Sequence, residues 1–185
     1  DLIMVFLALE LLSIPLYILS GFAVPRPESE EAALTYFILG AFSAGFVLYG
    51  TSLIFGGTHY TDLSDIVATI KMGSADLGLV TIGAGLLLVG FSFKVAAVPF
   101  HMWTPDVYQG APSPVTGFMS IGAKAAGFAA LIRVFTLAFP TLSPVIAPVF
   151  AVLAGLTMIV GNIAAVSQSN IKRLLAYSSI AHAGY

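Results

Sequence analysis

Three ionisable side chains lie inside long apolar stretches of the sequence. Glu10 has no polar neighbour before Ser13, Lys94 lies in a second apolar run, and Lys124 is the only charged residue in the range 116–131. A charged side chain at the centre of a membrane helix costs about 2.5–3.5 kcal/mol, so such residues usually mark an ion or proton pathway. An apolar environment favours the neutral amine of a lysine, whereas a nearby carboxylate favours the ammonium form. If Lys94 lies beside Glu10, a change in their separation would switch its protonation, which is the chemistry of a proton relay. Lys124 is the strongest single case for an internal functional lysine.

Each of these residues also has a structural interpretation. In the structural alternative, Glu10 lies at a membrane interface, and Lys94 extends its ammonium to water near the Pro99 break. Lys124 lies about 15 Å from the start of its helix, at about 1.5 Å per residue, which is too deep for such an extension. His182 is a further relay candidate, with a hydrogen-bonded packing histidine as the alternative.

The composition indicates that apolar helices position these residues. Hydrophobic residues make up 58% of the chain and charged residues 9%, with a mean hydropathy of +1.00, which suits a bilayer better than water. Spanning the hydrocarbon takes roughly 20 apolar residues in a helix. The chain contains no cysteine, which excludes disulfides, thiolate metal sites and iron–sulfur clusters. The predicted fold class is an all-α integral membrane protein, a multi-span helical bundle.

The apolar runs place the spans within a single transmembrane domain covering residues 1–185. A polar stretch between Thr58 and Asp76 has room for a short interfacial helix. Asp1 is not an initiating methionine and Tyr185 stops inside a periodic segment, so we expect a fragment of a longer protein. The expected spans are residues 2–24, 31–55, 77–98, 115–139, 145–166 and a truncated 171–185.

We expect the third span to break at prolines and to continue toward residue 109. Pro99 and Pro105 cannot donate backbone hydrogen bonds, so carbonyl groups at or near membrane depth need other partners. Trp103 and Tyr108 in this segment are predicted to anchor the chain at the membrane interface.

Basic residues predict the orientation of the chain. If the spans alternate, Arg26, Lys172 and Arg173 lie on one side of the membrane and Lys71 on the other. Cytoplasmic loops carry the excess of lysine and arginine, so the first side is predicted to be cytoplasmic.

A long motif surrounds the expected break, where residues 93–115 read FKVAAVPFHMWTPDVYQGAPSPV. This run resembles the antiporter-like membrane subunits of respiratory complex I, the NADH:quinone oxidoreductase, and its TPDVYQGAP form is typical of the N type. Residues 10–17 and 167–185 are similar to the family as well, so the resemblance covers essentially the whole chain. It implies a fragment of an inverted-repeat subunit, spanning the fifth to tenth of fourteen helices.

The resemblance also implies roles for individual residues. Glu10 matches the input glutamate of the family, Lys94 the channel lysine and Lys124 the relay lysine. The chain departs from the family at Thr35, where many members carry a lysine, so the resemblance does not carry an auxiliary proton position over to this residue.

The implied function is that of a non-redox, proton-translocating subunit of a translocase in a bacterial cell membrane. NADH, FMN, iron–sulfur clusters and quinone are expected in other subunits, with no cofactor on this chain. Expected partners are the lipid bilayer, the antiporter-like M and L subunits and small membrane subunits, but no nucleic acid. Two alternatives remain, namely a subunit of a multi-subunit cation/proton antiporter and a structural spacer of the membrane arm.

Overall fold

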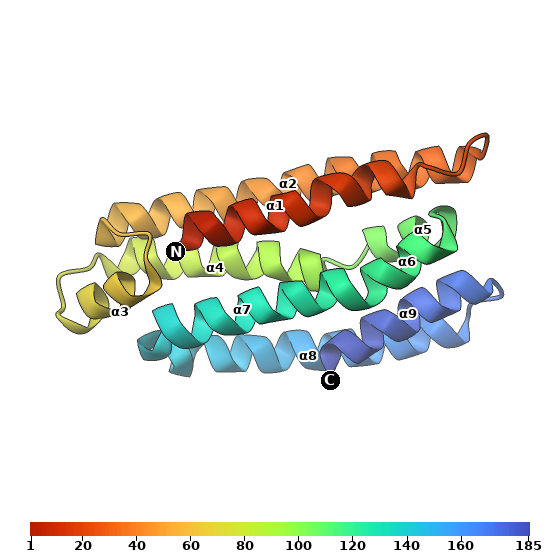
Figure 1. Cartoon of the computed structure of the whole chain (residues 1–185). Coiled ribbons are helices and arrows are strands. Elements are labelled where there is room, and N and C mark those ends of the chain that lie inside the picture. The colour runs from red at the N-terminus through yellow and green to blue at the C-terminus, as the bar shows by residue number, and fades with distance from the viewer.

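The computed structural model describes residues 1–185, and all its regular elements are helices (Figure 1). Five helical stretches are long and apolar enough to cross a membrane. Successive long helices run in opposite directions in one bundle, so the prediction of an all-α, multi-span bundle is confirmed. The elements are α1 (Leu2–Ser20), α2 (Pro27–Thr58), α3 (Leu63–Lys71), α4 (Leu77–Val95), α5 (Trp103–Gly110), α6 (Ser113–Phe118), the π-helix η1 (Met119–Ala123), α7 (Lys124–Ala138), the 3₁₀ turn η2 (Pro140–Leu142), α8 (Ser143–Val166) and α9 (Ile171–Gly184).

Helix α2 is longer at both ends than the sequence indicates. It starts at Pro27, where a proline suits the first helical position because the N–H there has no partner within the helix. It also continues through Gly57 to Thr58 instead of ending at the glycines. A Cβ atom on Gly57 would lie 2.9 Å from the carbonyl oxygen of Asp76. This glycine therefore permits close contact between chain segments and does not end the helix.

The same kind of contact brings α2 and α4 together in the middle of the bundle. A Cβ atom on Gly83 of α4 would lie 2.8 Å from the carbonyl oxygen of Gly50 on α2. Small residues allow membrane helices to approach in this way and to gain packing contacts that lipid does not supply. Helix α4, which carries Lys94, is therefore fixed against α2.

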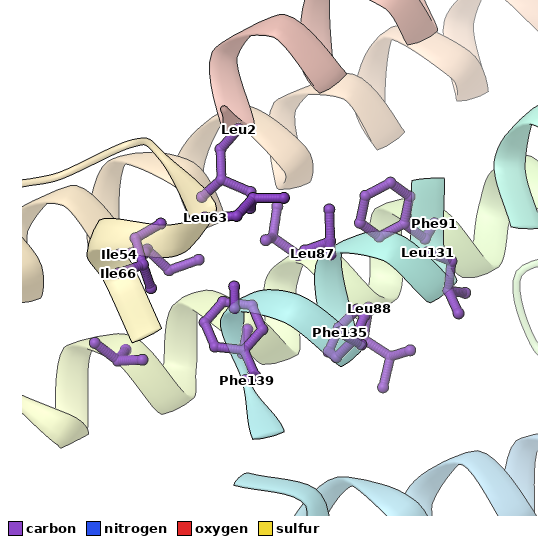
Figure 2. Close-up of a cluster of buried hydrophobic side chains, with 14 of the residues drawn as sticks. Leu2, Ile54, Leu63, Ile66, Leu87, Leu88, Phe91, Leu131, Phe135 and Phe139 are labelled. Atoms are coloured by element: carbon purple, nitrogen blue, oxygen red, sulfur yellow. The ribbon is translucent and has the colours of Figure 1, made fainter. Parts of the chain in front are cut away.

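Two clusters of buried apolar side chains stabilise the bundle. The first joins α2, α3, α4 and α7 at the end of the bundle where the chain begins (Figure 2). Short helix α3 contributes Leu63, Ile66 and Ile70 to it. Asp62 caps α3, and hydrogen bonds from the Ser64 hydroxyl and N–H hold the pKa of that carboxyl below its usual range. The second cluster surrounds the interruption between α4 and α5 and includes Trp103.

Candidate functional site

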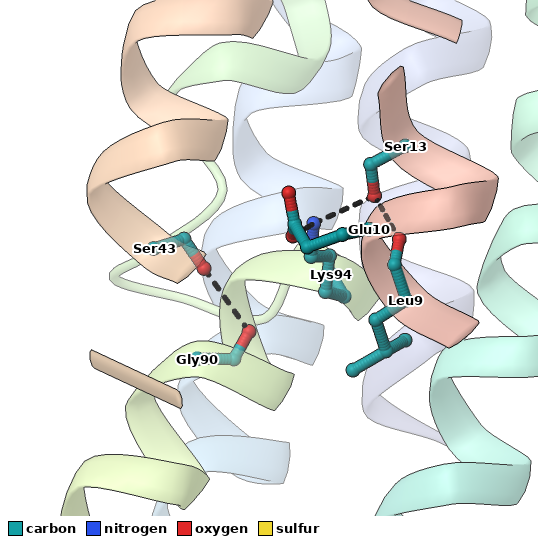
Figure 3. Close-up of polar contacts among 6 residues, drawn as sticks. All are labelled: Leu9, Glu10, Ser13, Ser43, Gly90 and Lys94. Atoms are coloured by element: carbon teal, nitrogen blue, oxygen red, sulfur yellow. Dashed lines mark hydrogen bonds and ion pairs between the residues drawn. The ribbon is translucent and has the colours of Figure 1, made fainter. Parts of the chain in front are cut away.

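Glu10 and Lys94 form an ion pair between α1 and α4. Glu10 lies near the middle of α1, and its Oε1 is 3.3 Å from Lys94 Nζ. The side chains are only 19% and 7% exposed, respectively. Lys94 Nζ also donates a hydrogen bond of 2.7 Å to Ser13 Oγ, which itself donates to the carbonyl oxygen of Leu9 (Figure 3). The ammonium thus points into the bundle, toward two acceptors on one face of α1.

The chain leaves helical geometry directly after this lysine. Helix α4 ends at Val95, and Ala96 adopts the left-handed conformation with φ of 61°. The N–H of Ala97 returns to the carbonyl of Ser92 at 2.8 Å, which satisfies one of the last acceptors of the helix. The break therefore begins three residues before Pro99.

Side chains from elsewhere satisfy two further backbone groups at the break. The indole Nε1–H of Trp103 donates to the carbonyl of Phe93 at 3.1 Å. The N–H of Val98 donates at 2.9 Å to the hydroxyl of Thr157, which is fully buried on α8. Irregular backbone at membrane depth persists only where protein or water supplies such partners.

Two sequence-based interpretations of this segment are wrong. Pro105 does not break a helix, because it lies in the first turn of α5, and the carbonyl of His101 accepts instead from the N–H of Thr104. Trp103 and Tyr108 do not anchor a membrane interface, because they are 3% and 2% exposed in the cluster around the break. Their aromatic surface packs within the bundle, where Trp103 also finds its hydrogen-bond acceptor.

Lys124 has a different environment from that of Lys94. It is buried, and its Nζ donates to the carbonyl oxygen of Ser179 at 2.7 Å and to the hydroxyl at 2.8 Å. Its ammonium is not within ion-pair distance of any carboxylate, since the pairs in the chain are Glu10–Lys94 and Arg173–Asp106. Only neutral oxygens of α9 therefore hold Lys124.

The helix that carries Lys124 is irregular immediately before it. Residues Met119–Ala123 form the π-helix η1, and Lys124 is the first residue of α7. Single turns of π-helix are rare and often occur at functional sites. No pattern in the sequence identified this element.

The two lysines lie on helices that touch each other. A Cβ atom on Gly127 of α7 would be 3.6 Å from Lys94 Cβ and 3.1 Å from Val95 Cγ1. Lys124 precedes Gly127 by three residues, which is almost one helical turn. The structure thus brings the predicted residues Glu10, Lys94 and Lys124 to neighbouring parts of α1, α4 and α7.

A cavity of about 480 Å³, lined mostly by polar residues, lies between α5, α6, η1 and α9. Ser179, the partner of Lys124, lines it, as does Tyr108, whose buried hydroxyl has no hydrogen-bond partner in the protein. His182 lies at this cavity with an exposed side chain, and its Nδ1 is 2.8 Å from the carbonyl oxygen of Ser178. Water is suited to such a space because several polar groups converge on it. The cavity residues are Tyr108, Ser113, Thr116, Gly117, Ser120, Lys172, Leu175, Ser178, Ser179 and His182.

Several residues of the site were not identified from the sequence. Ser13 was detectable, because it stands three positions after Glu10 and so lies on the same helix face. Ser179 and Thr157 had no such signal, since each acts across 55 or more positions of the chain.

Comparisons with known proteins place this geometry in a family. Residues 1–185 match the family described as NADH:quinone oxidoreductase/Mrp antiporter, transmembrane. NADH-quinone oxidoreductase subunit N of Chloroflexus aggregans is 56% identical over the whole chain, which spans 38% of that relative. Respiratory complex I from Thermus thermophilus with bound aureothin contains a chain that is 48% identical, with a TM-score of 0.84, and 39% of that chain is covered.

A more distant structure shares the same helix arrangement. A chain of the Mrp complex from Dietzia sp. matches with a TM-score of 0.88 at 25% identity, again over the whole of this chain and 34% of that one. The chain thus spans little more than a third of the length of the relatives it matches. It belongs to the NADH:quinone oxidoreductase/Mrp antiporter family of transmembrane proteins.

Proposed function

We propose that this chain carries protons within a membrane subunit of an NADH:quinone oxidoreductase, with Glu10, Lys94 and Lys124 as the relay. One observation carries the proposal, which is that Lys94 has a carboxylate partner while Lys124, on the adjoining helix, has only neutral acceptors. The two amines therefore differ in the partners that stabilise their charge. Such a difference is what proton exchange between two sites requires.

In this mechanism the separation between Glu10 and Lys94 controls the relay. While the pair is formed at 3.3 Å, the carboxylate stabilises the ammonium of Lys94. When the carboxylate moves away, the buried ammonium keeps only the neutral Ser13 hydroxyl as an acceptor and releases its proton. Lys124 exchanges that proton through the adjoining polar cavity, and His182 at the same cavity is a further carrier.

Electron transfer takes place elsewhere in this proposal. NADH, FMN, iron–sulfur clusters and quinone belong to other subunits, and quinone reduction there drives the movement of Glu10. The neighbours of the chain are other antiporter-like and small membrane subunits in a bacterial cell membrane. The 56% and 48% identities to proteins named for this enzyme support this assignment.

The experiment substitutes Lys94→Ala and Lys124→Ala singly in the full-length subunit of an assembled complex. We expect each variant to lower the number of protons translocated per NADH oxidised in sealed vesicles. The matched control is Lys71→Ala, because Lys71 is exposed on α3 outside the site. Unchanged proton stoichiometry in both lysine variants would show that the charges only pair helices, as in a structural spacer.

A cation/proton antiporter is the second candidate, favoured by the close structural match to the Mrp complex. It predicts cation-driven proton movement in vesicles that receive no electron donor. This match has 25% identity, against 56% and 48% for the proteins named for the oxidoreductase. The identities therefore support the antiporter less than the oxidoreductase subunit. Cation-driven exchange that is lost in Lys124→Ala would favour the antiporter.

A further inference from the structure

Half-helix α5 is held at both of its ends by side-chain hydrogen bonds. At the start, Trp103 donates to the carbonyl of Phe93 at 3.1 Å. At the end, Lys172 Nζ of α9 donates to the carbonyl oxygens of Ala111 at 2.9 Å and Gln109 at 3.3 Å. Helix α5 packs against α2 and α9 through buried side chains such as Trp103 and Tyr108. The hydrogen bonds add a fixed point at each end of this packed helix.

Lys172 suits the end of α5 for two physical reasons. The last carbonyls of a helix have no partner within it, and the ammonium supplies up to three donors. The C-terminal end of a helix also carries partial negative charge, which a cation stabilises. The ammonium of Lys172 therefore donates to two carbonyl acceptors and also stabilises the negative end of the helix dipole.

The neighbouring ion pair contributes less to this connection. Arg173 pairs with Asp106 on α5 and lies 3.3 Å from Gln109 Oε1. The side chains of the pair are 31% and 54% exposed, and exposed pairs are weakened by solvent and salt. The bonds from Lys172 are thus the polar contacts made to the last carbonyls of α5 itself.

The two helices joined by Lys172 reach both lysines of the relay. Helix α9 also carries Ser179, which holds Lys124. Helix α5 carries Tyr108 at the cavity beside Ser179 and contacts the residue before Lys94 through Trp103. A displacement of α5 would therefore alter the surroundings of both amines.

We propose that Lys172 is a positioning residue that holds half-helix α5 against α9 and so preserves the geometry of both relay lysines. Its ammonium bonds to α5 and to neither relay amine, and its side chain also lines the cavity beside Ser179. The effect of Lys172 on proton transfer rests on the proposed function. The contact between Lys172 and α5 is independent of that function.

The test uses the full-length subunit in the assembled complex and three variants. Lys172→Met keeps the length of the side chain but removes the donors and the charge, Lys172→Arg restores both, and Lys71→Met is the control at the opposite end of the bundle. Hydrogen–deuterium exchange of residues 103–111 reports the position of α5, and protons translocated per NADH report the relay.

We expect Lys172→Met to speed exchange of these amides by about tenfold, the factor that loss of a hydrogen bond to a charged group produces in a local opening equilibrium. Proton stoichiometry falls in the same variant, Lys172→Arg restores both readouts, and Lys71→Met changes neither. Lys172→Gln, whose amide keeps donors without the charge, gives intermediate values and serves if Lys172→Met does not assemble.

Three outcomes would overturn the inference. Unchanged exchange of residues 103–111 in Lys172→Met shows that the contact does not hold α5, whatever Lys94→Ala and Lys124→Ala do. Faster exchange with unchanged proton stoichiometry shows that the contact is only structural, provided that Lys94→Ala lowers the stoichiometry. If Lys94→Ala and Lys124→Ala leave the stoichiometry unchanged, the proposed function fails and the positioning role fails with it.

Discussion

At the scale of single residues, the ammonium of Lys94 is shared between a carboxylate and a hydroxyl. Ser13 Oγ is closer to it than Glu10 Oε1 is, at 2.7 Å against 3.3 Å. Removing one partner of a buried ion pair costs about 3–5 kcal/mol, because the remaining charge is left uncompensated. Ser13 lowers this cost, since it continues to accept from Lys94 when Glu10 moves away.

The contribution of Ser13 leads to a prediction. Ser13→Ala removes a hydrogen bond to a charged group, worth about 1.5–3 kcal/mol, so the ammonium of Lys94 is less stabilised while the ion pair is formed. Fewer relay cycles then start with a protonated Lys94. We expect slower NADH-driven proton translocation, measured with a pH-sensitive dye in sealed vesicles.

A matched control exists on α2. Ser52 donates to the carbonyl four residues earlier, as Ser13 does, but is exposed and far from any lysine of the relay. Ser52→Ala should therefore leave the rate unchanged. Equal rates in the two variants and the parent complex would contradict the role given to Ser13.

Single residues also show how much of the candidate site could be predicted from the sequence. Glu10, Lys94 and Lys124 are visible in it because each interrupts an apolar run at a cost that needs an explanation. The partner of Lys124 is not visible, because Ser179 is one of two adjacent serines on α9 and only the register between α7 and α9 selects it.

At the scale of elements, the interruption between α4 and α5 is stabilised from α8. Thr157 accepts from the N–H of Val98 and donates to the carbonyl of Leu153. An unsatisfied buried N–H costs about 1–3 kcal/mol. A helix that touches neither lysine thus helps to keep the broken segment in place.

The corresponding prediction concerns stability. Thr157→Val leaves the Val98 N–H without an acceptor, so we expect a loss of about 1–3 kcal/mol and a lower midpoint of thermal unfolding for the purified complex. Thr136→Val is the control, because exposed Thr136 makes the same bond within its own helix and no other. An equal midpoint for both variants would argue against the role of Thr157.

Helix boundaries show why parts of the fold could not be predicted. Pro27 and the left-handed Ala96 mark ends that follow from local backbone chemistry, although only prolines are conspicuous in the sequence. The expected span 31–55 stops just before Gly56 and Gly57, whereas α2 continues to Thr58. In a sequence, a glycine that ends a helix and one that admits another chain segment look alike. What distinguishes the two kinds of glycine here is the position of Asp76, which depends on the tertiary structure.

At the scale of the whole molecule, three of the seven lysine and arginine residues lie at one end of the bundle. Arg26 lies in the connection between α1 and α2, and Lys172 with Arg173 lies at the start of α9. Both connections are at the same end in Figure 1, and the loop after α3 is at the other end. This distribution predicts that the α8–α9 connection faces the cytoplasm.

The absence of cysteine from the 185 residues makes the orientation directly testable. Single cysteines replace exposed residues at opposite ends of the bundle, Ser169→Cys between α8 and α9 and Met72→Cys after α3. We expect a membrane-impermeant thiol reagent to modify position 169 only from the cytoplasmic side and position 72 only from the outer side. Mass spectrometry of the labelled peptides reads the result, and the reverse pattern would invert the orientation.

The π-helix before Lys124 has a consequence for how this subunit tolerates insertions and deletions. In a helix each residue turns the chain by about 100°, so removing one residue from Met119–Ala123 would rotate Lys124 relative to α6 by that angle. The amine would then lie on a different face of its helix from the one that meets Ser179. The length of this one turn, rather than the identity of its side chains, sets the direction of the lysine.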